Sequence, residues 1–361
     1  WRTVLICGQG PGKGSSLAGG LNYYFALDVT NPANPQPLWE FTHAQMGETW
    51  SVPTVGRVTI ANQPTWVAFM GSGYDNDPVE KVGNRFHVVD METGDEVWGF
   101  DAPEVDTTAA LGWNIDNTIP ASPAVVELDQ DGFTDSVYIA DLEGRMWKVD
   151  VTPNLSNPAK WVEEMIYEDS NNFPIVCKPA IWINPVSTDI VPRLYFGTGG
   201  DDRAPGDVNY SFISLIDSTV PEVEWYLGDP AVLGLPMGKD QGDLDIGSKV
   251  WADPQQADFI VYFSTLIGSI DSVDPCESLA GVGKLYARYI QAEAGTAIGS
   301  TSLESFTGPV ESLELSIKSS AAVTLGVRLI TVEGTRKREV YFMEYDSSIE
   351  RLVNLEIALL R

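Results

Sequence analysis

The segment Ser136–Asp150, SVYIADLEGRMWKVD, carries the pattern that decides the fold. A short run of β-branched and aromatic residues ends at Asp141, a polar turn containing glycine follows, and a second run contains tryptophan. Short apolar runs of this composition, bounded by turn residues, are typical of β-strands. The segment therefore predicts two antiparallel strands joined by a tight turn.

The same unit recurs along the chain. Clear copies span Tyr23–Phe41 and Arg85–Phe100, and weaker copies begin at Arg193, Phe212 and Phe259. The clear copies stand about 50 to 60 residues apart, a period typical of propeller blades with inserted loops. A chain of 361 residues holds seven units at about 50 residues per blade.

We therefore expect an all-β fold, a β-propeller of seven modified blades, formed by a single domain over residues 1–361. Eleven tryptophans and an aromatic content of 10% suit this fold, because large side chains pack between adjacent blades. The residues leave two alternatives open, a large irregular β-sandwich and two stacked β domains.

The charge balance restricts the partners. The chain has 22 basic and 51 acidic residues, a net charge of −29. No nucleic-acid partner is expected, because phosphate binding requires a basic face, and an anionic membrane surface is disfavoured for the same reason. Divalent cations are natural counterions for so acidic a chain. No apolar run is long enough to predict a membrane-spanning segment.

Cysteine and histidine are too scarce to predict a catalytic or zinc centre. Cys7, Cys177 and Cys276 allow at most one internal disulfide. His43 and His87 are the two histidines, no Cys/His cluster is present, and no Ser/His/Asp order stands out. His87, inside a predicted strand, is interpreted as structural.

A more specific motif, ELDQDGFTD, lies directly before the opening segment, at Glu127–Asp135. Acidic residues occupy its positions one, three, five and nine, and Gly132 occupies position six, which is the spacing of an EF-hand calcium loop. Calcium takes six to eight oxygen ligands, so it needs carboxylates that converge from a short stretch of backbone. The flanking runs, Pro123–Val126 and Val137–Ala140, predict strands, so we expect an EF-hand-like loop between strands.

The ligand positions follow from the spacing. Alternate side chains supply the first oxygens, a backbone carbonyl follows, and the last aspartate closes the site. The predicted ligands are Glu127, Asp129, Asp131, Phe133 (through its carbonyl) and Asp135. Position twelve, a bidentate glutamate in a full EF-hand, is Tyr138 here, so a compact loop is expected. The alternative is a solvated acidic β-turn, because Asp and Gly are also ordinary turn residues.

The order of the motifs resembles the PilC/PilY family of type IV pilus assembly proteins and pilus-tip adhesins. The resemblance runs from residue 1 to about residue 290 and is strongest over residues 118–151. The motifs that carry it, in order, are Trp1–Leu5, Tyr24–Val29 with Leu38–Phe41, Ala121–Val126, Asp141–Asp150, Tyr195–Gly199 and Val261–Thr265.

The resemblance implies the modified β-propeller of the family's C-terminal domain, with one calcium loop whose ligands fall on the five positions named above. The family more often has Asp or Asn where this chain has Glu127. It further implies the C-terminal domain of a longer secreted protein, one that supports pilus extension over retraction and surface adhesion. Minor pilins at the pilus tip and a host or abiotic surface are the implied partners, and the pilus tip or cell surface the implied location.

Two other functions remain as alternatives. Quinone-dependent dehydrogenases also have tryptophan-containing propellers and use calcium, but their ligands come from dispersed blades. Here the candidate ligands lie in one contiguous loop, and no vicinal cysteine pair is present, so a non-enzymatic protein is expected. The other alternative is a generic extracellular binding propeller, unrelated to pili.

Overall fold

The computed structural model describes residues 2–10, 22–75, 81–104, 116–153, 156–184, 190–201, 203–229, 234–236, 239, 242–257, 259–267, 282–290, 313–316, 322–332, 335–346 and 351–360. Cys276, one of the three cysteines that the expectation about disulfides concerns, lies outside these ranges. Among the described residues, no helix combines the length and the hydropathy needed to cross a bilayer.

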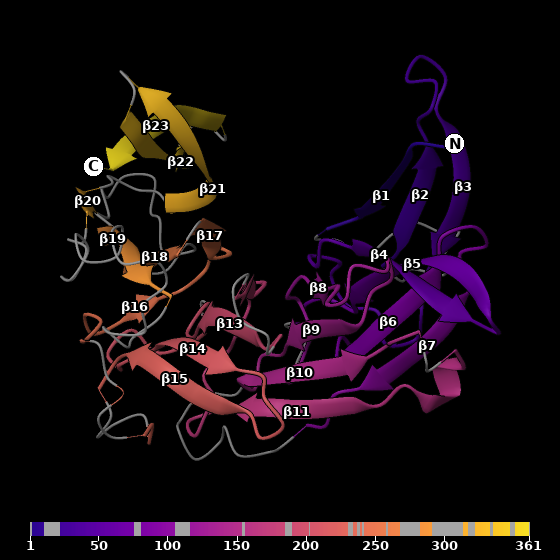
Figure 1. The fold of residues 1–361 in the computed structure, drawn as a ribbon, viewed down its shortest axis with the longest axis horizontal. Helices are drawn as coiled ribbons and strands as arrows, with labels where there is room; N and C mark the ends of the chain where they lie inside the picture. The colour runs from indigo at the N-terminus through magenta and orange to yellow at the C-terminus, as the bar shows by residue number, and fades with distance from the viewer. Residues whose placement is uncertain are drawn as a thin grey trace. The chain divides into compact units, whose positions relative to one another are not determined.

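The strands of the described residues form six sheets (Figure 1). The first three sheets contain β1 (Val4–Gly8), β2 (Tyr24–Asp28) and β3 (Gln36–Phe41); β4 (Thr54–Ile60), β5 (Gln63–Gly71), β6 (Arg85–Asp90) and β7 (Glu96–Asp101); and β8 (Ala124–Val126), β9 (Ser136–Ala140), β10 (Arg145–Asp150) and β11 (Glu163–Glu168). A short 3-10 segment, η2 (Pro158–Lys160), precedes β11.

The other three sheets follow in chain order. They contain β12 (Ala180–Ile183), β13 (Pro192–Gly197), β14 (Phe212–Ile216) and β15 (Glu222–Leu227); β16 (Ser248–Lys249), β17 (Gln255–Ala257), β18 (Ile260–Ile267), β19 (Val282–Tyr289) and β20 (Leu313–Ser316); and β21 (Ala322–Val332), β22 (Thr335–Asp346) and β23 (Arg351–Leu360).

Each sheet is built from consecutive, antiparallel strands, as expected for blade-like units. The prediction of an all-β fold is therefore confirmed. By its contacts the chain divides into two compact units, Trp1–Lys178 and Pro179–Arg361. The seven-blade count and the single domain over residues 1–361 stay predictions.

The opening segment forms the predicted hairpin. Strands β9 and β10 pair from Met146 opposite Ala140 to Asp150 opposite Ser136. Oδ1 of Asp141 accepts hydrogen bonds from the backbone N–H groups of Glu143 and Arg145, at 3.1 and 3.0 Å. An aspartate that accepts from the backbone two residues ahead stabilises a turn, which explains why the repeat places Asp at the strand end.

The tryptophans pack between sheets of the first unit. Nε1 of Trp39, on β3, donates to the carbonyl of Met91, which follows β6 of the second sheet, at 3.0 Å. Trp98, on β7, lies edge-on to Trp161 beside the third sheet, with ring centroids 6.2 Å apart. One core cluster joins buried residues of the second and third sheets, including Phe86 and Ile139.

Candidate functional site

The loop Glu127–Asp135 connects β8 to β9, so it lies between strands as expected. Its backbone is shaped by local hydrogen bonds: the N–H of Asp131 donates to Oδ1 of Asp129 at 3.2 Å, and the N–H of Phe133 donates to Oδ1 of Asp131 at 2.7 Å. Gly132 has φ +82°, the left-handed region that glycine adopts without strain. The alternation of aspartates therefore shapes the turn as well as supplying carboxylates.

Three of the predicted ligands converge. Carboxylate oxygens of Glu127, Asp129 and Asp135 all lie within 4.8 Å of one another. Calcium–oxygen distances are about 2.3–2.6 Å, so two oxygens on one ion lie at most about 5 Å apart. The three carboxylates are therefore spaced as ligands of one hard divalent cation. The Asp131 carboxylate is not part of this converging group.

Asp135 joins the loop to the protein interior. Only 5% of the residue is exposed, and Oδ2 accepts a hydrogen bond from the N–H of Leu128 at 2.6 Å. Burial raises the pKa of Asp135; the Leu128 hydrogen bond opposes this shift, and the nearby charges of Asp129, Asp131 and Glu127 add to it. A bound cation would offset the same repulsion, so the donor set fits a divalent ion.

The loop also contacts a strand that sequence reasoning did not connect with it. The guanidinium carbon of Arg57, on β4, lies 4.4 Å from the centroid of the Phe133 ring. The backbone N–H of Thr134 donates to the carbonyl of Arg57 at 2.7 Å. No spacing in the sequence links these positions, because the contact depends on how two sheets pack.

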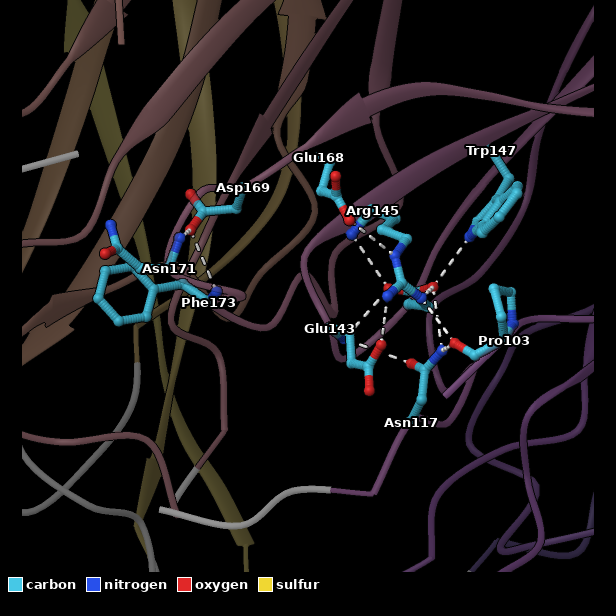
Figure 2. A network of polar contacts seen from close by, with 10 residues as sticks. Pro103, Asn117, Glu143, Arg145, Trp147, Glu168, Asp169, Asn171 and Phe173 are labelled. Carbon is cyan, nitrogen blue, oxygen red and sulfur yellow. Dashed lines mark hydrogen bonds and ion pairs between the residues drawn. The ribbon is translucent and has the colours of Figure 1, made fainter. Parts of the chain in front are cut away.

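A second buried polar cluster surrounds Arg145 (Figure 2). Arg145 and Glu143 are each 1% exposed, and their side chains form an ion pair. Nη1 of Arg145 donates to the carbonyl of Pro103 at 2.7 Å, and Nε donates to Glu168 at 3.3 Å. Asp141, 0% exposed, accepts from Nε1 of Trp147 at 2.9 Å. These bonds hold backbone segments together, and Asp141, Glu143 and Arg145 are buried, so we interpret the cluster as structural.

A hydrogen-bonded chain of Ser72, His87 and Glu96 has the order of a hydrolase triad. Ser72 Oγ lies 2.7 Å from His87 Nε2, and His87 Nδ1 lies 2.7 Å from Glu96 Oε1. Although burial opposes the shift, hydrogen bonds from His87 and Arg85 lower the pKa of Glu96 to about 2. For His87, in contrast, burial is the main cause of the shift and lowers the pKa.

Access decides the role of this chain of hydrogen bonds. Ser72 and His87 are both 0% exposed, so a substrate carbonyl cannot approach the serine oxygen. The chain instead ties the end of β5 to β6 and β7, which supports the structural interpretation of His87. Sequence reasoning missed the triad-like order, because the serine and the glutamate lie on opposite sides of the histidine in the sequence and meet only through strand pairing.

Comparison with known proteins gives the family context. Residues 13–167 match the family model described as the PilY1 beta-propeller domain, a stretch that contains the loop Glu127–Asp135. A type IV pilus biogenesis factor PilY1 homolog from Xylella fastidiosa is 32% identical over 257 residues, which is 65% of this chain and 16% of that protein. The type IV pilus biogenesis factor PilY1 of Pseudomonas aeruginosa strain UCBPP-PA14 is 32% identical over 162 residues, 44% of this chain and 12% of that protein. The chain thus spans about a sixth or less of the length of these relatives.

A solved structure shows the fold. The crystal structure of the Pseudomonas aeruginosa PilY1 C-terminal domain matches with a TM-score of 0.60 and 18% sequence identity, over 94% of this chain and 79% of that one. This match and the family model confirm the predicted β-propeller. Residues 13–167 of this chain are therefore similar to the PilY1 β-propeller domain, the resemblance that its ordered motifs indicated.

Proposed function

We propose that this chain is the calcium-binding propeller of a type IV pilus biogenesis protein. The observation that carries the proposal is the convergence of three carboxylates within 4.8 Å, in a loop inside the segment that matches the PilY1 propeller. The relatives are named type IV pilus biogenesis factors, and the chain is assigned the same role.

Calcium would be held by the loop's own oxygens. The proposed ligands are the side chains of Glu127, Asp129, Asp131 and Asp135 and the carbonyl of Phe133. The ion supplies the positive charge that lets these carboxylates lie together; without it their mutual repulsion loosens the loop. Calcium therefore acts as a conformational switch, and a partner that contacts the ordered loop distinguishes the two states.

The pilus context gives the remaining assignments. The chain is proposed as a single seven-bladed domain over residues 1–361, the C-terminal domain of a longer secreted protein. It acts without catalysis at the pilus tip or cell surface, where it supports extension over retraction and surface adhesion. Minor pilins, and a host or abiotic surface, are its partners.

Calorimetric titration with calcium chloride tests the metal site. Wild type is expected to bind one calcium ion. Asp131→Ala and Asp129→Asn are each expected to weaken calcium binding by about tenfold or more, because the number of charged ligands sets the affinity of such loops. The matched control is Glu92→Gln, which removes one carboxylate from an exposed turn outside the loop and should bind as wild type does. Equal calcium affinity in all four proteins would contradict the site.

Co-purification tests the pilus assignment. The chain, with and without calcium, is mixed with purified minor pilins from the same organism, and complex formation is measured by gel filtration. Calcium should strengthen the complex, and Asp131→Ala should lose that dependence. Failure to bind minor pilins in either condition, with glycan binding present instead, would favour a generic extracellular binding propeller.

A further inference from the structure

Four hydrogen bonds join β4 and the residues beside it to segments that flank the strands of the third sheet. Strand β4 is an edge strand of the second sheet, and β8 is an edge strand of the third (Figure 1). Their seam, as we call it, consists of four bonds: Val52 N–H to Ser122 Oγ (2.9 Å), Thr54 Oγ1–H to the Pro123 carbonyl (2.7 Å), Thr134 N–H to the Arg57 carbonyl (2.7 Å) and Ala61 N–H to the Ser156 carbonyl (2.8 Å).

The candidate calcium loop supplies one of these bonds, through Thr134. The approach there is close: a Cβ placed on Gly56 of β4 would lie 2.4 Å from Oγ1 of Thr134. Glycine is thus required for the loop to reach the strand. Thr134 is 5% exposed, so the loop end next to Asp135 is packed against β4.

Arg57 makes a second contact with the loop. Its guanidinium carbon lies 4.4 Å from the centroid of the Phe133 ring, within the range of a cation–π contact. Phe133 is the residue whose carbonyl is the proposed backbone ligand. The backbone carbonyl of Arg57 holds the next residue, Thr134. Arg57 therefore contacts the loop at two points. Its guanidinium lies against the Phe133 ring, and its carbonyl accepts the hydrogen bond from the N–H of Thr134.

We propose that ion binding in the loop is coupled to the seam between the second and third sheets, with Arg57 as a positioning residue for the ion. This inference rests on the proposed calcium site. Ordering the loop holds Thr134 and Phe133 against β4, so the bound ion stabilises the seam. By thermodynamic linkage an intact seam raises calcium affinity by the same factor.

Hydrogen exchange on the wild-type chain tests the coupling without any variant. Calcium should slow exchange of the seam amides of Val52, Ala61 and Thr134 by about threefold or more, since local opening free energies respond to ligand binding. The amides of the β1–β2 pair, which lie outside the seam, are the internal control. Slowing confined to the loop, with the Val52 and Ala61 amides unchanged, overturns the proposal.

A double-mutant cycle tests the role of Arg57. Calcium affinity is measured for wild type, Arg57→Met, Phe133→Leu and the double variant, and Arg2→Met controls for the loss of one positive charge. A cation–π contact that supports the ion gives non-additivity of about two- to fivefold in affinity. Arg57→Met and Arg2→Met each lose one positive charge. A change in calcium affinity that both variants share is therefore a general charge effect, and the cycle does not count it as coupling.

The outcomes separate the two proposals. If wild type binds no calcium, the proposed function fails and this inference fails with it. If wild type binds calcium, but the cycle is additive and exchange at the seam is unchanged, only the coupling is overturned. Loss of folding in a variant is detected by its melting temperature, and the wild-type exchange experiment then decides the matter alone.

Discussion

Replacing Arg145 by methionine tests the buried polar cluster of Figure 2. Methionine fills much of the same volume but cannot pair with Glu143, which is 1% exposed, or donate to the carbonyl of Pro103. Asp141 keeps its hydrogen bonds from Trp147 and from the backbone. The substitution therefore removes the cation from two buried carboxylates, those of Glu143 and Asp141.

The expected loss is large, because two buried carboxylates would be left without their cation. Removing one partner of a buried ion pair costs about 3–5 kcal/mol of unfolding free energy. Adding Glu143→Gln to Arg145→Met removes one of these two buried charges, so the double variant should recover at least about 1 kcal/mol, the scale of an unsatisfied buried group.

The measurement is urea-dependent hydrogen exchange of peptides from β9 and β10, the strands that flank the turn. Exchange of these amides reports the stability of the unit that contains the cluster. A loss below about 1 kcal/mol in Arg145→Met, or a further loss when Glu143→Gln is added, would refute the reasoning that Arg145 stabilises the cluster by compensating buried charge.

Three further predictions concern pH, a turn and the metal. Burial, opposed mainly by backbone N–H groups, raises the pKa of Asp169 to about 6. Between about pH 4 and pH 6 the folded state therefore holds a proton on Asp169 that the unfolded state releases. The contribution of Asp169 to stability falls as pH rises over this interval. Asp169→Asn should therefore reduce the pH dependence of the melting temperature between about pH 4 and pH 6. Gly94→Ala should cost about 1–3 kcal/mol in urea unfolding, because φ is +79° and the new Cβ would lie 2.6 Å from Cγ of Trp39; a neutral result would contradict the close packing of these sheets. Removing calcium with a chelator should lower the melting temperature of wild type by more than that of Asp131→Ala, which binds the ion more weakly.

The repeat was predictable from sequence because its causes are local. Asp141 accepts hydrogen bonds from residues two and four positions ahead, so the turn that it forms is encoded within a few residues. The ELDQDGFTD motif was recognisable for the same reason: the alternation of Asp129 and Asp131 shapes the loop through its own backbone.

The convergence within the loop was only partly predictable. The spacing placed five ligands on one ion, and the carboxylates of Glu127, Asp129 and Asp135 converge, while that of Asp131 is not part of the group. Asp131 accepts the backbone N–H of Phe133, a bond that the spacing alone does not reveal. The direction of each carboxylate depends on these competing bonds.

The sequence by itself determined the strands, their turns and the acidic loop, because these depend on neighbours within one hairpin. Only the tertiary structure decided that the loop packs against Arg57 and Gly56, and that Ser72, His87 and Glu96 form a closed chain. Such contacts join residues from different strands or sheets, and their distances are set by sheet packing and strand register. The loop's chemistry is thus local, whereas its coupling to the rest of the propeller is a property of the fold.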